Sequence, residues 1–278
     1  MLKVFSCLNT LCRIAQTGTV YRKKTSVVLL SVLIVACGEG MGGGGGGGNS
    51  LLTGTGGSTA KMTLAGDYLY AISGSSVQLF DVSTPSSPAP WTKVDIDWDI
   101  QTLFPYGDYL LIGAADGVHI LDNTDPAAPQ YVGDFQHATA RDPVVAQDGI
   151  AYVTLRRDLT QPGPGIANQM SVLDISDVTQ PALLDTVPMQ GPSGLSVRGN
   201  RLYVCDGAAG LKIFDLTDPV KPEVVHVIPG LDCSDVIATD ELLYVIDDLG
   251  LSQYDLSTDE PVLLSTVDTE PVIYIVDR

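Results

Sequence analysis

Positively charged side chains are scarce over most of this sequence. Five of its 15 Lys and Arg residues precede Cys37, where no acidic residue occurs. The part after Cys37 carries 10 basic against 33 acidic side chains, a net charge of −23. An excess of this size repels phosphate backbones and anionic lipid headgroups. We therefore expect no nucleic-acid partner, whereas cations, cationic partners and neutral glycans remain open.

The motifs of common catalytic classes are also missing. The sequence has no GxSxG, no HExxH and no phosphate-binding glycine loop, because its polyglycine run lacks the following Lys-Ser/Thr. Its three histidines form no recognisable Ser-His-Asp or Cys-His arrangement. We therefore predict no catalytic residues, and the sequence favours a non-enzymatic role.

No apolar run is long enough to cross a bilayer, but a shorter one lies near the start. Arg22-Lys23-Lys24 precedes an apolar stretch that ends at Ala36. A basic stretch, a short apolar core and a small residue form the pattern of a secretory signal, here residues 1–36. Ile34-Val35-Ala36-Cys37 resembles a bacterial lipobox. We expect an exported lipoprotein anchored to a membrane through Cys37, with the outer membrane favoured and its periplasmic or surface face left open. A plain signal peptide is the alternative.

The residues after Cys37 predict a tether. Seven consecutive glycines, Gly42 to Gly48, have no side chains to bury, and polyglycine loses the most backbone entropy on ordering. We predict a flexible segment over residues 37–58 that separates the anchor from a folded domain.

The remaining residues, 59–278, are built from five copies of one pattern. In each copy an apolar or Tyr-containing pair follows a turn, and about eleven residues later an apolar run ends in Asp. The intervals between these aspartates are 41, 52, 41 and 40 residues, because the third copy contains an insertion. The repeat aspartates are Asp81, Asp122, Asp174, Asp215 and Asp255.

Each copy contains four short apolar runs separated by Gly, Asp, Asn, Pro or Ser. In the fourth copy the runs are Leu195–Val197, Arg201–Cys205, Leu211–Leu216 and Glu223–Ile228. Such runs suit strands, and four antiparallel strands in about 41 residues match a propeller blade. We predict an all-β propeller with five blades over 59–97, 98–138, 139–190, 191–231 and 232–278. The run from Val272 to Val276 would either close the ring or begin a sixth blade.

The repeat resembles the LVIVD family of bacterial and archaeal exported or cell-surface proteins. Its best matches are GLKIFDLTDPVKP, from Gly210, and GVHILDNTDPAAP, from Gly117. The resemblance covers residues 59–278 and implies a β-propeller in an exported protein. It implies no particular chemistry.

Carboxylates occur at two repeated places. The five repeat aspartates each precede turn residues, so we predict that they accept backbone N–H groups in Asx-turns. A second set, Asp99, Asp142 and Asp235, precedes the first strand of its blade, which lines the central channel. Oxygen ligands without Cys or His suit Ca²⁺, so this set is the candidate metal site. We predict no other cofactor. Solvated turn carboxylates are the alternative.

Cys205 and Cys233 are the cysteines that remain after Cys37. An exported protein is in an oxidising compartment. Strand alternation puts both positions at the same end of neighbouring blades, so we expect a disulfide between them.

The insertion in the third copy, from about Arg156 to Gln169, lies between the second and third strands of its blade. It should emerge where each blade continues into the next. Arg and Trp are enriched at binding hot spots. The proposed recognition surface at this end consists of Trp98, His137, Arg141, Arg156 and Arg157. The alternative is an ordinary surface loop.

Three functions are consistent with these features. The first is a non-catalytic binding or scaffolding module with a protein or glycan partner at the cell envelope. The second is a propeller hydrolase resembling lactonases, with a cation at the channel. The third is a cell-surface adhesin.

Overall fold

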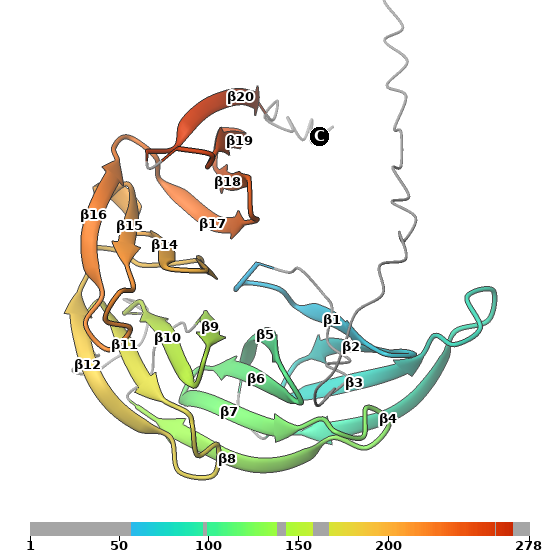
Figure 1. Ribbon diagram of the computed structural model, residues 1–278. Coiled ribbons are helices and arrows are strands. Elements are labelled where there is room, and N and C mark those ends of the chain that lie inside the picture. The colour runs from blue at the N-terminus through green and yellow to red at the C-terminus, as the bar shows by residue number, and fades with distance from the viewer. Residues whose placement is uncertain (1–56, 97–98, 138–142, 158–166, 259, 269–278) are drawn as a thin grey trace, which may run out of the picture. The chain divides into compact units, whose positions relative to one another are not determined.

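The computed structural model describes residues 57–96, 99–137, 143–157, 167–258 and 260–268. Its contacts divide the chain into residues 1–47 and 48–278, and every described residue lies in the second unit. The strands form five four-stranded antiparallel sheets, each with its strands in sequence order (Figure 1). The chain is therefore an all-β propeller with five blades, which confirms the predicted fold.

The strands of the blades are as follows. The first blade contains β1 (Met62–Ala65), β2 (Tyr68–Ser73), β3 (Ser76–Asp81) and β4 (Ala89–Asp95). The second contains β5 (Ile100–Tyr106), β6 (Tyr109–Ala114), β7 (Gly117–Asp122) and β8 (Gln130–Gln136). The third contains β9 (Val144–Gln147), β10 (Ile150–Leu155), β11 (Gln169–Asp174) and β12 (Ala182–Pro188). The fourth contains β13 (Leu195–Arg198), β14 (Arg201–Cys205), β15 (Leu211–Asp215) and β16 (Glu223–Ile228). The fifth contains β17 (Cys233–Ala238), β18 (Leu242–Asp247), β19 (Gly250–Asp255) and β20 (Val262–Asp268).

Helical structure is minimal in the part of the chain that the structure describes. It consists of the three-residue 3₁₀ turn η1 (Gly207–Ala209). No helix in these residues is long and apolar enough to cross a membrane.

Local turn chemistry explains why each repeat folds in the same way. The backbone N–H two residues after each repeat aspartate donates to its carboxylate, at 2.9 Å for Asp81, 2.8 Å for Asp122, 2.9 Å for Asp174, 2.7 Å for Asp215 and 2.7 Å for Asp255. These are the predicted Asx-turns. The Ser176 and Thr217 hydroxyls, together with these N–H donors, hold the pKa of Asp174 and Asp215 below the usual range.

The blades pack through apolar faces. Four clusters of buried side chains lie between consecutive blades, from the first and second to the fourth and fifth. Leu110 is 1% exposed at the first of these boundaries, and Leu202 is fully buried at the third. Inward-facing residues of one sheet therefore form their core with the next sheet, as expected for sheets that cannot bury both faces alone.

The boundary between the fifth and first blades differs. No cluster joins these two blades among the described residues. Met62 is 64% exposed and Leu64 is 50% exposed on β1, and Ile246 is 49% exposed on β18. The run from Val272 to Val276, which the sequence offered as a closing strand, lies outside the described residues.

The propeller has two distinct ends, because strand direction alternates. We call the end that carries the first-to-second strand turns and the third-to-fourth strand loops the turn end. We call the opposite end, which carries the connections between blades, the interblade end. The innermost strands, β1, β5, β9, β13 and β17, are the first strands of the five sheets, and the labelled β5, β9 and β17 face the centre in Figure 1.

Candidate functional site

The segment that precedes β1 is bound at the interblade end of the channel. The Leu195 N–H of β13 donates to Ser58 Oγ at 2.7 Å, and the Leu103 N–H of β5 donates to the Ala60 carbonyl at 2.8 Å. Thr59 donates to the carboxylate of Asp235 on β17. Residues 57–60 therefore contact the innermost strands of three blades, and Ser58 is fully buried.

Asp235 is occupied by this segment. Besides the Thr59 hydroxyl it accepts the Val236 N–H at 2.9 Å, and burial raises its pKa above the usual range despite these donors. The chain passes close to it, since a Cβ added at Gly57 or Gly194 would lie 2.3 or 2.2 Å from a carboxylate oxygen. The carboxylate thus fixes the start of the propeller.

The predicted calcium set is not assembled in the part that the structure describes. Asp99 is exposed before β5, and Asp142 lies outside the described residues. No group of three or more His, Cys, Asp or Glu side chains suited to a metal ion occurs among the described residues. Asp235 lies within β17 rather than before it as predicted, and its oxygens accept from Thr59 and Val236.

The disulfide between Cys205 and Cys233 is present in the structure. It joins β14 of the fourth blade to β17 of the fifth, with 5.4 Å between the Cα atoms. Ser193 bonds to both cysteine carbonyls, through its N–H to Cys205 at 2.9 Å and through its hydroxyl to Cys233 at 3.0 Å. The bridge therefore crosses a blade boundary at the interblade end.

A buried ion pair lies beside the disulfide, and the sequence did not reveal it. Asp206 is fully buried and accepts the N–H groups of Gln190 and Gly191 at 2.7 and 2.9 Å. Lys212 lies 2.6 Å from its second oxygen. The sequence did hold a signal for this pair, because Asp206 and Lys212 stand on either side of the short turn from β14 to β15. This pair holds the connection between the third and fourth blades.

The residues of the predicted recognition surface are only partly described. Trp98 and Arg141 lie outside the described residues, as does the lipidation candidate Cys37. His137 is half-buried, with its ring 6.4 Å from that of Phe135. Arg156 and Arg157 are both exposed directly after β10. The described members therefore include two neighbouring cations at the interblade end.

The base of the insertion is tied to the connection that leads from the third blade to the fourth. Asn168 accepts the Arg157 N–H at 2.8 Å and donates to the carbonyl of Gln190. The two ends of the insertion are thus held together, since Leu155 pairs with Gln169 across β10 and β11. This arrangement presents the intervening residues at the interblade end.

A hydrogen-bonded chain on the second blade was also missed. His119 Nε2 lies 3.0 Å from Asp116, its Nδ1 lies 3.3 Å from the Tyr131 hydroxyl, and Tyr131 donates to Asp134 at 2.7 Å. Burial together with Asp134 raises the pKa of Tyr131. These contacts connect β7 to β8 and to the β6–β7 turn, which makes the chain a support of the sheet.

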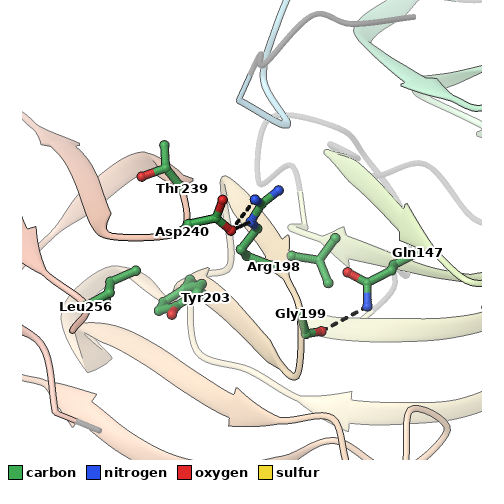
Figure 2. A pocket seen from close by; sticks show the side chains of 8 residues that line it. Gln147, Arg198, Gly199, Tyr203, Thr239, Asp240 and Leu256 are labelled. Carbon is green, nitrogen blue, oxygen red and sulfur yellow. Dashed lines mark hydrogen bonds and ion pairs between the residues drawn. The ribbon is translucent and has the colours of Figure 1, made fainter. Parts of the chain in front are cut away.

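The turn end contains a polar pocket between the third, fourth and fifth blades (Figure 2). Its volume is about 460 Å³, within the range of small-molecule sites. Arg198 and Asp240 form an ion pair in the pocket, and the Gln147 amide donates to the Gly199 carbonyl at 2.9 Å. The remaining lining residues are Val197, Tyr203, Thr239 and Leu256.

Tyr203 differs from its counterparts in other blades. Tyr70 donates to the carbonyl of Pro126 at 2.5 Å, and Tyr152 donates to that of Pro219 at 2.9 Å, in each case on the following blade. The position that corresponds to these prolines is Asp259, which lies outside the described residues. Tyr203 is 5% exposed, and its hydroxyl has no hydrogen-bond partner among the described residues. Burial raises its pKa, so this group remains a donor at the pocket.

The repeated four-stranded blades define the protein as a β-propeller. Its sequence matches the LVIVD repeat over residues 56–95, 166–188 and 192–227. This match supports the resemblance drawn from the sequence. No curated protein matches the chain significantly.

Solved structures with a similar fold have very different sequences. One is a proposed 6-phosphogluconolactonase from Bacteroides fragilis, with a TM-score of 0.59, 15% identity, and coverage of 75% of this chain and 70% of that one. The periplasmic gluconolactonase PpgL of Pseudomonas aeruginosa has a TM-score of 0.58 and 15% identity, with coverage of 73% of this chain and 68% of that one. AztD of Citrobacter koseri has a TM-score of 0.53 and 14% identity, with coverage of 73% of this chain and 61% of that one. At these identities the similarity establishes the fold alone.

Proposed function

We propose that this protein is an exported, lipid-anchored β-propeller that acts as a non-catalytic binding or scaffolding module at the cell envelope. The supporting observation is the attachment of residues 57–60 at the interblade end. Because these residues bond to three blades, a tether that follows Cys37 would join the propeller at this end. An anchor at Cys37 would then hold the propeller by this end.

The sequence predicts a flexible tether over residues 37–58, and we propose that it lets the propeller reorient on its anchor. A flexible chain of about 20 residues has a root-mean-square length of roughly 25 Å. The interblade end, with Arg156 and Arg157, and the turn end, with its pocket, are then both accessible to partners. We expect a protein or glycan partner in the periplasm or on the cell surface, with the outer membrane as the site of anchoring.

The anchor is tested by replacing Cys37 with Ser. The variant should move from the membrane fraction to the soluble fraction, while the wild-type protein remains with the membrane after a salt wash. Ser50→Ala, in the same tether, is the matched control and should not change the distribution. A Cys37→Ser protein that still resists the salt wash rules out lipid attachment at this residue.

The binding role is tested by crosslinking in intact cells, followed by mass spectrometry of captured partners. A partner that is captured by the wild-type protein and competed by the purified domain supports the module. An adhesin would instead lose cell attachment when the protein is removed from the producing strain.

An enzyme of the lactonase type is the second candidate, favoured by the names of two structures with similar folds. A cation at Asp99, Asp142 and Asp235 was its predicted centre. Asp235 is bound to Thr59, which weakens this candidate. Stoichiometric Ca²⁺ in the purified protein, together with hydrolysis of gluconolactone that chelation abolishes, would establish it in place of the binding module.

A further inference from the structure

We infer that the turn-end pocket binds a neutral carbohydrate through Gln147, Arg198, Tyr203 and Asp240. The inference deepens the proposed function by naming a ligand class, and it rests on that binding role. The site is independent of the interblade end, where the partner surface was predicted.

The first argument is the balance of charge in the pocket. Arg198 and Asp240 are the two charged residues that line it, and they pair with each other. The lining therefore has no net charge to attract an anion or a cation. The domain around it is strongly acidic, which further disfavours phosphate and other anions.

The second argument is the supply of hydrogen-bonding groups. The Tyr203 hydroxyl is available as a donor, and Arg198 keeps one guanidinium nitrogen outside its pair with Asp240. Acceptors are the second carboxylate oxygen of Asp240 and the amide oxygen of Gln147, whose amide nitrogen is used by Gly199. Sugar hydroxyls donate and accept at once, so a polyhydroxyl ligand matches a lining of mixed donors and acceptors.

The third argument comes from the repeat itself. At the same strand position Tyr70 and Tyr152 use their hydroxyls to bond the following blade. Tyr203 makes no such bond to a described residue, and its side chain lines the pocket instead. Its hydroxyl is therefore available to donate to a ligand that enters the pocket.

The apolar residues complete the match. Val197 and Leu256 are both partly buried and line the pocket together with the polar groups. Carbohydrate rings present C–H faces between their hydroxyl edges, which such side chains would contact. The volume of about 460 Å³ suits a short oligosaccharide rather than a protein segment.

The test is titration calorimetry on the full-length protein in detergent, with maltose, cellobiose and diacetylchitobiose as neutral probes and inorganic phosphate as the anionic probe. We expect at least one sugar to bind with one site per chain, and phosphate not to bind. Tyr203→Phe should weaken binding about tenfold with little change in melting temperature, since it removes one hydrogen bond. Asp240→Asn should weaken it as well.

Tyr152→Phe is the matched control. It removes the same hydroxyl from a neighbouring blade, so it should lower the melting temperature and leave sugar affinity unchanged. The inference is overturned if no sugar binds at millimolar concentration, if Tyr203→Phe binds as tightly as the wild-type protein, or if phosphate displaces the sugar. Partner capture in cells by a protein that binds no sugar would leave the proposed function standing while this site fails.

Discussion

Thr59 donates a hydrogen bond to Asp235, a residue 176 positions further along the chain. This bond attaches the first described residues to the innermost strand of the fifth blade. It connects the start of the propeller to its fifth blade, at the boundary where no apolar cluster of described residues joins the first and fifth blades. A single polar contact thus takes part in holding the two ends of the repeat array together.

The charge of Asp235 should make this contact depend on pH. Burial raises its pKa above the value of the unfolded chain, so the neutral carboxyl favours the folded state. That contribution is complete below the unfolded-state pKa of about 3.9 and is lost as pH rises through the folded-state pKa. Asp235→Asn, which stays neutral, should be at least as stable as the wild-type protein at pH 7. The difference in melting temperature should shrink towards pH 4.

Controls separate charge from hydrogen bonding at this position. Asp235→Ala removes the acceptor of Thr59 and should cost about 1–3 kcal/mol at pH 7. Asp99→Asn changes an exposed carboxylate just before the first strand of the second blade and should have little effect. A difference between the wild-type protein and Asp235→Asn that is constant from pH 4 to pH 7 would contradict the shifted pKa.

The disulfide should stabilise the fourth and fifth blades. It closes a segment of 28 residues, and restricting the unfolded chain over that length contributes about 3 kcal/mol. Urea unfolding with and without reductant should show this loss, and reductant should not affect a Cys205→Ser, Cys233→Ser double variant. Mass spectrometry of unreduced, alkylated protein provides the direct check, since alkylation at both residues would show that no bridge forms.

The interblade surface should depend on the insertion. Leu155 pairs with Gln169, so replacing residues 156–168 with Asn-Gly leaves a two-residue hairpin of a favoured type. We expect the melting temperature to change by a few degrees at most and partner capture to be lost, because Arg156 and Arg157 are removed. The milder variant Arg156→Ser, Arg157→Ser should reduce capture without altering the hairpin. Undiminished capture by both variants would place the partner surface elsewhere.

The fold was predictable because its determinants are local and repeated. Each repeat aspartate forms its turn with the residue two positions later, so spacing alone identified where strands end. The pairing of Cys205 with Cys233 followed from strand direction in the same way. Both relationships depend on short segments whose geometry the sequence specifies.

The candidate sites were harder to predict from the sequence because they depend on contacts between blades. Nothing in a glycine-rich segment predicts that Ser58 and Thr59 bind the channel, and this contact occupies a carboxylate that was predicted to bind Ca²⁺. Asp206 was not recognised because its burial results from the connection between two blades. The turn-end pocket combines Gln147, Arg198 and Asp240 from three blades, at positions that the repeat does not keep constant.

Replacing a leucine with alanine should destabilise the protein less at the boundary between the fifth and first blades than at the other boundaries. Leu69 and Leu110 occupy equivalent positions on the second strands of the first and second blades. Leu110 is buried against Tyr70 and Leu103, whereas Leu69 is half-buried and faces the boundary without an apolar cluster. Leu110→Ala should therefore cost about 2–5 kcal/mol, and Leu69→Ala less than about 1.5 kcal/mol. Equilibrium unfolding of both variants measures the contrast. Equal losses would show that residues outside the described ranges cover Leu69 and complete this boundary in solution.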